Sequence, residues 1–250
     1  MSKRLYLAVF CLALVTVVFG QERIVKMTLS TEIQLKKDSL TDAQIGEQLN
    51  LLQNSLAVNE RHADNWWKTW IILYGAATIG QGAIALTTHQ KSLRQDMILG
   101  AGTTLLGVAN QLLTPVTTGF KPIGTDSIAK LSILEKTEKL AQGEEILKKQ
   151  AQIAQAGKGW QVHALSGAVN LASGLITWIG FKRPFGEGVF NFALNTVITE
   201  TQIWTQPFRA KKTYEQYMLA KSRGFGTFLT NTPEWYSQVS PASCSFGIRF

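Results

Sequence analysis

The sequence predicts an all-α protein made of two repeated helical hairpins, with an amphipathic soluble helix before each hairpin. The main observation is a segment that occurs twice without a gap, since residues 68–115 align with residues 160–207 at a shift of 92 positions. The short basic breaks within the two copies and their final prolines also fall into register. The identical pairs are Leu73/Leu165, Gly75/Gly167, Ala76/Ala168, Gly82/Gly174, Ile84/Ile176, Ala101/Ala193, Thr104/Thr196 and Pro115/Pro207.

Four apolar stretches make up the two copies, and we predict that they are transmembrane helices. Each has about the 20 residues that cross a hydrocarbon core, and their approximate bounds are 66–88, 97–117, 160–181 and 188–206. Tryptophan prefers the level of the lipid headgroups, and tryptophans lie near the ends of these stretches: Trp66, Trp67, Trp70, Trp160, Trp178 and Trp204. The pattern therefore predicts membrane lipid as a partner. Because each stretch is also rich in Gly, Ala, Thr, Asn and Gln, a soluble helical bundle remains an alternative.

The first 20 residues have the three parts of a secretory signal peptide. Lys3 and Arg4 precede an apolar run that ends at Phe19, and we expect cleavage before Gln21. The mature N-terminus would then lie on the exported side of a membrane, and four spans would return the C-terminus to the same side. Both hairpin turns would face the cytoplasm, where basic residues are favoured; these are Lys91, Arg94, Lys182 and Arg183.

These patterns divide the chain into consecutive segments. We predict a signal peptide (1–20), an N-terminal arm and amphipathic helix (21–62), a first hydrophobic hairpin (63–118), a charged helical linker (119–159), a second hydrophobic hairpin (160–207), and an interfacial helix with an irregular tail (208–250). The first amphipathic helix is indicated by residues spaced to share one helix face, namely Ile45, Leu49, Leu52 and Leu56. A stripe of this kind requires a partner helix. A final strand is expected over 243–250.

Charge and cysteine content narrow the classes of partner. The formal net charge is +8, and removal of Lys3 and Arg4 with the signal peptide would leave +6. This excess suits an anionic lipid surface, whereas scattered charges on an exported protein do not favour nucleic acid. Cys244 is the single cysteine after the signal peptide, so the mature chain has no internal disulfide and no thiolate metal cluster.

Polar and small residues recur at helical spacing within the apolar stretches and form a candidate polar seam. Its members are Thr78, Gln81, Asn110, Asn170, Ser173, Asn195, Glu200 and Gln202. One interpretation is that these side chains join helices through hydrogen bonds, and the other is a hydrated path or polar ligand site between the repeats. Two pairs of small residues, Ala76 with Gly80 and Ala168 with Ala172, are candidates for close helix contacts.

Glu200 is the most unusual residue of the seam. A carboxylate within a spanning helix must be neutralised, paired or exposed to water. It could serve a proton relay, or it could be a protonated side chain bonded to another helix. Its mate in the repeat is Val108, so the acid does not belong to the duplicated pattern.

The sequence gives little indication of catalysis. His62, His89 and His163 are the only histidines, and none has a second histidine or a carboxylate at metal-ligand spacing on an evident shared face. We therefore predict no catalytic residues, no metal and no cofactor.

The preferred hypothesis is a non-enzymatic integral membrane protein of a cell envelope, acting as a structural or assembly component of a larger complex or homo-oligomer. Its partners would be membrane lipid and other protein subunits or further copies of itself. One alternative is a small channel or transporter that uses the polar seam and Glu200. Another is a soluble exported helical bundle that binds a protein or lipid.

Overall fold

The computed structural model describes residues 41–222 and the backbone of two strands at 234–240 and 243–249. The predicted signal peptide and N-terminal arm lie outside the described residues. The elements belong to the unit Asp42–Phe250. They are α2 (Asp42–Thr87), α3 (Lys91–Leu113), α4 (Thr125–Ala129), α5 (Ile133–Ala156), α6 (Trp160–Leu175), the π-helical turn η3 (Ile176–Gly180), α7 (Phe185–Thr205), α8 (Arg209–Ser222), β1 (Glu234–Ser240) and β2 (Ser243–Arg249). The predicted helical character is confirmed.

Helix α2 is one uninterrupted helix of 46 residues. At 1.5 Å per residue it is about 69 Å long, which is roughly twice the thickness of a hydrocarbon core. The amphipathic segment and the first apolar stretch, which the sequence suggests as separate segments meeting at residue 62, are therefore halves of a single rod. The corresponding helices of the second half, α5 and α6, are separated by the short turn Gly157–Gly159.

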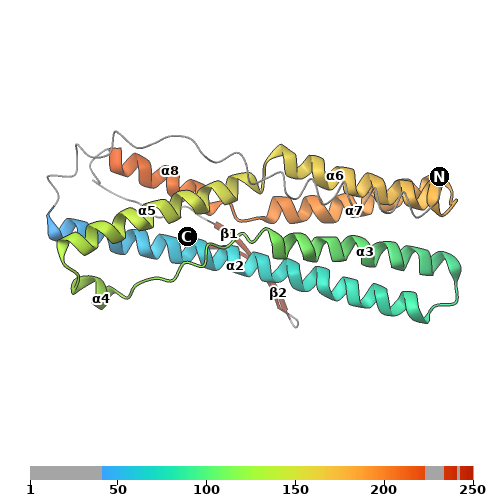
Figure 1. Cartoon of the computed structure of the whole chain (residues 1–250), viewed down its shortest axis with the longest axis horizontal. Helices are drawn as coiled ribbons and strands as arrows, with labels where there is room; N and C mark the ends of the chain where they lie inside the picture. Colours follow the sequence, from blue (N-terminus) through green and yellow to red (C-terminus); the bar gives the residue numbers. More distant parts are fainter. Residues whose placement is uncertain (1–40, 223–233, 241–242, 250) are drawn as a thin grey trace. The chain divides into compact units, whose positions relative to one another are not determined.

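The helices form two groups along α2 (Figure 1). The N-terminal half of α2 packs with α4 and α5, and α8 packs on α5. The C-terminal half of α2 forms a hairpin with α3, and α6 with η3 forms a second hairpin with α7. We call the first group the polar bundle (42–62, 125–156 and 209–222) and the second group the hairpin bundle (66–113 and 160–205).

The polar bundle has an ordinary apolar core. The predicted stripe Ile45, Leu49, Leu52 and Leu56 is buried, with exposed fractions of 7% or less, and the core also contains Ile128 and Leu147. Gly143 of α5 permits close packing here, since an added Cβ atom would lie 2.8 Å from a methyl group of Leu52. The partner helix that the stripe requires is α5.

The charged linker differs from the single helix that the sequence suggested. Ser132 ends the α4 region and begins α5 with a capping box, in which its backbone amide donates to Glu135 at 2.8 Å and its hydroxyl accepts from the Glu135 amide at 3.4 Å. A capping box satisfies backbone amides that have no partner at the start of a helix, so it marks Ser132 as a helix boundary. Leu134 consequently lies 76% exposed rather than in the core.

The apolar side of α8 also differs from the expectation of a helix lying in the lipid interface. Tyr217, Thr213 and Ala210 are buried, and α8 packs on α5. The Tyr217 hydroxyl donates to Glu144 of α5 at 2.6 Å, and the Lys221 ammonium lies 2.6 Å from the same carboxylate. Protein rather than lipid therefore covers this face. After α8, β1 and β2 pair antiparallel with Trp235 opposite Ile248, so the expected final strand is present within a hairpin.

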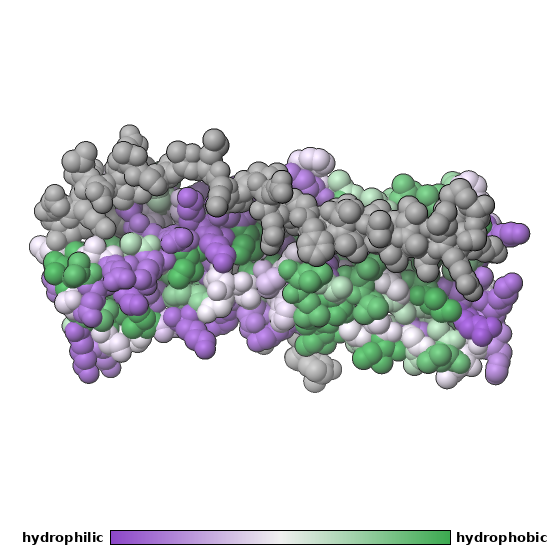
Figure 2. Space-filling view, viewed as in Figure 1, coloured by the Kyte–Doolittle hydropathy of each residue, from purple (hydrophilic) through white to green (hydrophobic). Residues whose placement is uncertain are grey.

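Burial in the hairpin bundle is inverted relative to the polar bundle. Its buried side chains are mostly polar, whereas its large apolar side chains are exposed: Ile79 is 75%, Leu86 89% and Phe190 69% exposed. Of the large apolar residues that are exposed in the described chain, all but Ile133, Leu134, Met218 and Leu219 belong to the hairpin bundle. Figure 2 shows this contrast, with hydrophobic residues gathered over the hairpin helices and hydrophilic residues over the polar bundle.

Two helices in the described chain are long and apolar enough to cross a membrane. They are α2 and the continuous helix of α6 and η3, Trp160–Gly180. Only 17% and 22% of their most apolar stretches are buried. The core helix of a soluble protein would pass the same test of length and composition, but it would be mostly buried. The low buried fraction of these two helices therefore says more about their surroundings than their length and composition do.

Candidate functional site

The polar seam of the first hairpin lies at the contact between α2 and α3. The Thr78 hydroxyl donates to the Thr104 hydroxyl at 2.8 Å, and Thr104 lies 3.3 Å from the side-chain oxygen of Gln81. Gly100 provides the space for Gln81, because an added Cβ atom would lie 2.7 Å from the amide of that side chain. Predicted seam residues Thr78 and Gln81 are therefore engaged within one hairpin.

The second hairpin has a matching contact. Asn170 of α6 is 3% exposed and donates to Thr199 of α7 at 2.9 Å and to Thr196 at 3.4 Å. The pair Asn170 and Thr196 follows the pair Thr78 and Thr104 by the same 92 positions as the sequence alignment.

A second polar contact lies one turn further along the same hairpin. The Ser173 hydroxyl, 2% exposed, donates to the Asn191 side-chain oxygen at 2.7 Å. The Asn195 amide donates to the same oxygen at 3.1 Å and to Ser173 at 3.3 Å. These hydrogen bonds join α6 to α7 within the second hairpin.

Two hydrogen bonds join α2 of the first hairpin to α7 of the second. The Tyr74 hydroxyl of α2 donates to the Gln202 side-chain oxygen of α7 at 2.7 Å, and the Trp66 indole donates to the Thr205 hydroxyl at 3.2 Å. Gln202 thus belongs to the contact between hairpins. Asn110, the remaining amide of the predicted seam, lies on the exposed side of α3 instead of facing the other seam residues.

Glu200 is paired with a histidine. Its carboxylate lies 2.9 Å from Nδ1 of His163 on α6, and the side chains are about one-third exposed at 32% and 31%. The Trp204 ring lies 6.0 Å from the imidazole. Carboxylates at metal-ligand spacing from each histidine were the only ones considered in the sequence, so this pair on two different helices was not identified there. The signal was available, since the two residues are at similar distances on either side of the α6–α7 turn and antiparallel helices bring such positions together.

Of the four residues predicted to make close helix contacts, three are exposed in the described chain and Ala172 is half-buried. Ala76, Gly80 and Ala168 are exposed, and nothing lies within 4 Å of an added Cβ atom at Gly80. The closest approach is instead between Gly174 and Gly188, where each added Cβ atom would lie 2.7–2.8 Å from the backbone oxygen of the other residue. Spacing alone did not reveal which face of each helix was turned toward its neighbour.

Both hairpin turns are joined at one end of the hairpin bundle. Arg183, which follows the left-handed residue Lys182 (φ 57°), lies 2.6 Å from Asp96 of α3. Its guanidinium also donates to the Ser92 backbone oxygen at 3.5 Å. The hydrogen bond and charge of Asp96 raise the pKa of Arg183 above its ordinary value.

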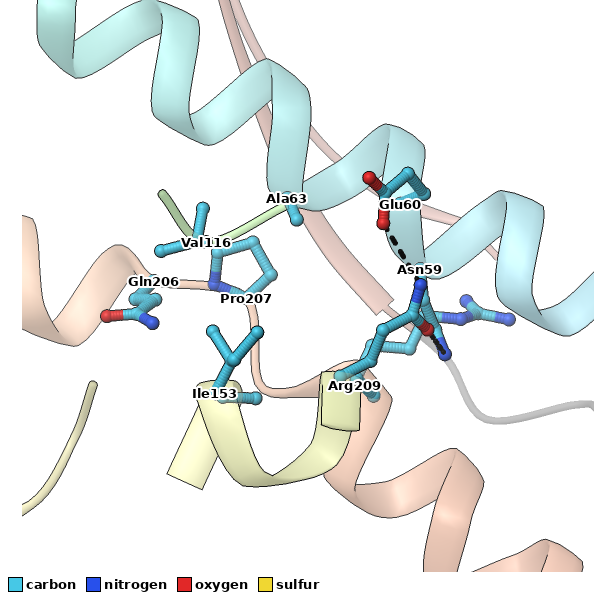
Figure 3. A pocket seen from close by; sticks show the side chains of 11 residues that line it. Asn59, Glu60, Ala63, Val116, Ile153, Gln206, Pro207 and Arg209 are labelled. Carbon is cyan, nitrogen blue, oxygen red and sulfur yellow. Dashed lines mark hydrogen bonds between the residues drawn. The ribbon is translucent and has the colours of Figure 1, made fainter. Parts of the chain in front are cut away.

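The opposite end of the hairpin bundle meets the polar bundle at a small cavity that both apolar and polar side chains line. Its volume is about 20 Å³, which is room for about one water molecule. Figure 3 shows Glu60 and Asn59 of α2 on one side, with Ile153 of α5 and Pro207, between α7 and α8, on the other.

Glu60 binds the segment that follows the first hairpin through several hydrogen bonds. Its carboxylate accepts from the backbone amides of Thr118 at 2.9 Å and Gly119 at 2.6 Å, and from the Thr118 hydroxyl at 2.8 Å. Gly119 has φ +70°, a conformation that glycine adopts without strain. Gln150 of α5 donates to the same carboxylate at 3.1 Å, so Glu60 joins three segments.

The surroundings of these groups indicate what the site can do. Among the residues with described side chains, no group of three or more His, Cys, Asp or Glu could hold a metal ion. The His163–Glu200 pair lies within hydrogen-bond distance, while the other seam residues are joined by hydrogen bonds across or between hairpins, Asn110 excepted. Comparison with protein-family models, curated proteins and solved structures finds no match.

Proposed function

We propose that the chain is a non-enzymatic integral membrane protein of a cell envelope, acting as a structural or assembly component of a larger complex or homo-oligomer. The observation that carries this proposal is the inverted burial of the hairpin bundle. Apolar side chains as large as Phe190 and Trp204 are 69% exposed there, while Ser173 and Asn170 are 2% and 3% exposed. In water this arrangement is costly, whereas in lipid it satisfies both sets of side chains.

All four hairpin helices are proposed to span the membrane. From Trp66 to Thr87, α2 rises about 32 Å, and α3 and α7 have 23 and 21 residues. These lengths match a hydrocarbon core of about 30 Å. Amide side chains within α3 and α7, together with a few charged residues, reduce their average hydropathy. Exposed apolar residues such as Leu105 and Leu194 nevertheless lie on their middle turns.

Duplication of one hairpin explains the resemblance between the halves. Helices α3 and α7 end at Leu113 and Thr205, which are 92 positions apart, as in the sequence alignment. The hydrogen-bonded pairs Thr78–Thr104 and Asn170–Thr196 obey the same shift. Agreement of contacts, and not only of composition, supports a common origin of the two hairpins.

The polar seam supports a structural role over a channel. Its side chains bond to the facing helix of the same hairpin, as Thr78 and Ser173 do, or to the other hairpin, as Gln202 does. Such bonds between spanning helices contribute about 0.6 kcal/mol each on average. A conduit would instead require polar groups that remain available to water.

The basic residues of the hairpin turns support one orientation of the protein in the membrane. We propose that the joined turns, with Lys91, Arg94 and Lys182, face the cytoplasm, and that the polar bundle and both mature termini lie on the exported side. The ion pair between Arg183 and Asp96 supports a common side for both turns. The outer faces of the hairpins, including Ala76 and Gly80, are then available to lipid, to other subunits or to a second copy.

Labelling of introduced cysteines tests this proposal. In a Cys244→Ser background, His89→Cys and Gly186→Cys place thiols at the two turns, and Glu145→Cys places one on the polar bundle. We expect the protein to stay in the membrane pellet after carbonate extraction. A membrane-impermeant maleimide added from outside should label position 145 but not positions 89 and 186. Release by carbonate, or labelling of all three positions in intact cells, would contradict the proposal.

A further inference from the structure

The boundary between the bundles carries a cluster of lysines around one aromatic ring. The ammonium groups of Lys158 and Lys211 lie 5.6 Å and 5.0 Å from the centre of the Phe208 ring. Lys158 belongs to the α5–α6 turn, whereas Lys211 and the neighbouring Lys212 belong to the first turn of α8. Residues distant in sequence thus concentrate positive charge at one place, which we call the lysine cluster (Lys158, Lys211 and Lys212).

The chain offers this charge little compensation. Within the described residues, the acidic contact of the cluster is Glu215, 3.8 Å from Lys211. The first turn of α8 has no acidic residue, although the N-terminal end of a helix favours negative charge. Burial and the neighbouring charge of Lys212 lower the pKa of Lys158. The positive charges therefore repel one another, and a bound anion would reduce this repulsion.

The cluster also lies beside aromatic residues that suit the lipid headgroup region. The Lys158 ammonium donates to the backbone oxygen of Trp204 at 3.0 Å. The indole of Trp204 is 69% exposed, and that of Trp160, two residues after Lys158, is 74% exposed. Exposed indoles at the end of apolar helices favour the membrane interface. A headgroup phosphate at this level would meet the ammonium groups while its acyl chains lie along the exposed helix faces.

We propose that the lysine cluster binds the phosphodiester headgroup of an anionic glycerophospholipid on the exported side of the membrane. This inference rests on the membrane assignment proposed above. The ammonium groups of Lys158 and Lys211, which both lie over the Phe208 ring, would contact the phosphate, and Lys212, which is exposed, would add long-range attraction. Basic residues near an anionic membrane surface contribute about 1 kcal/mol each.

The test measures thermal unfolding of the full chain in dodecyl maltoside with added phosphatidylglycerol, phosphatidylcholine or inorganic phosphate. We expect phosphatidylglycerol to raise the melting temperature by several degrees more than phosphatidylcholine, and inorganic phosphate to have no comparable effect. The variant Lys158→Gln/Lys211→Gln/Lys212→Gln should lose this increment. The matched control Lys130→Gln/Lys148→Gln/Lys149→Gln removes the same charge from the polar bundle and should keep it.

Each other result has a defined meaning. An equal loss in both triple variants would reduce the effect to net charge and overturn the site. An equal response to inorganic phosphate would overturn the lipid assignment. If the triple variant does not fold, Lys212→Gln alone, at an exposed position, should reduce the increment, and an unchanged increment would overturn the proposal. A protein that resists carbonate extraction but lacks the phosphatidylglycerol response would refute this inference and leave the proposed function standing.

Discussion

Gly174 of α6 and Gly188 of α7 bring the backbones of the second hairpin into direct contact, because an added Cβ atom on either residue would lie 2.7–2.8 Å from the backbone oxygen of the other. The repeat mate of Gly174 is Gly82, where nothing lies within 4 Å. We therefore expect Gly174→Ala to lower the free energy of unfolding by about 1–3 kcal/mol through overpacking. Gly82→Ala, the matched control, should be neutral or stabilising by up to about 1 kcal/mol because alanine favours helix. Thermal unfolding in detergent, followed by circular dichroism, measures both; equal destabilisation would contradict the close approach.

Glu60 should be the most sensitive acidic residue of the polar bundle. Glu60→Ala removes the acceptor for the backbone amides of Thr118 and Gly119 and for Gln150. Leaving such donors without a partner costs about 1–3 kcal/mol, and denaturant unfolding in detergent measures this cost. The control Glu145→Ala changes an exposed carboxylate of α5 and should stay within about 0.5 kcal/mol of the parent protein. A Glu60→Ala protein as stable as the control would show that water replaces the carboxylate.

Tyr217 makes the stability depend on alkaline pH. Burial, and then the charge and hydrogen bond of Glu144, raise the pKa of Tyr217 above its ordinary value of 10.0. Above about pH 10 the unfolded chain loses the phenol proton while the folded chain keeps it, so the free energy of unfolding falls as the pH rises. Below about pH 10 the phenol is neutral in both the folded and the unfolded chain, so it does not make the free energy of unfolding depend on pH. Chemical unfolding between about pH 9 and 11 should show a steeper decline for the parent protein than for Tyr217→Phe. Parallel declines would mean that the phenol is not held in its neutral form.

An acidic residue on the outer face of a hairpin distinguishes lipid from water as the solvent. Ile79 is 75% exposed near the middle of the proposed first span, and Leu219 is 55% exposed on α8. In lipid, Ile79→Asp should cost about 3 kcal/mol and reduce the amount of protein recovered in the membrane fraction. Leu219→Asp should leave that amount unchanged, because its position faces water. Normal recovery of both variants would place the hairpin bundle in an aqueous environment.

Helical character and the stripe of α2 could be predicted from sequence because both depend on local spacing. Ile45 and Leu56 had to share a face of any helix that contained them, and a partner helix was the only way to bury that face. The boundary between the linker helices was also readable in principle, since Ser132 and Glu135 have the spacing of a capping box. The helical spacing of Ile128, Leu131 and Leu134 instead favours one continuous helix across this boundary.

The candidate site depended more on tertiary geometry than on local pattern. The seam residues Thr78 and Asn170 were found by helical spacing, but their partners are set by the register of each hairpin. The same register pairs His163 with Glu200, although 37 positions separate them. Small residues fit several faces equally well, so spacing favoured Ala76 and Gly80, while the folded chain uses Gly174 and Gly188.

The unbroken α2 has a mechanical consequence. Each residue of the helix adds a rotation of about 100°. A continuous α2 therefore fixes how the polar bundle is rotated about the helix axis relative to the hairpin bundle. The second half has no such continuous helix, because the turn at 157–159 separates α5 from α6. A rotation or tilt of the polar bundle would therefore pass to the turns at the far end of the hairpins through α2.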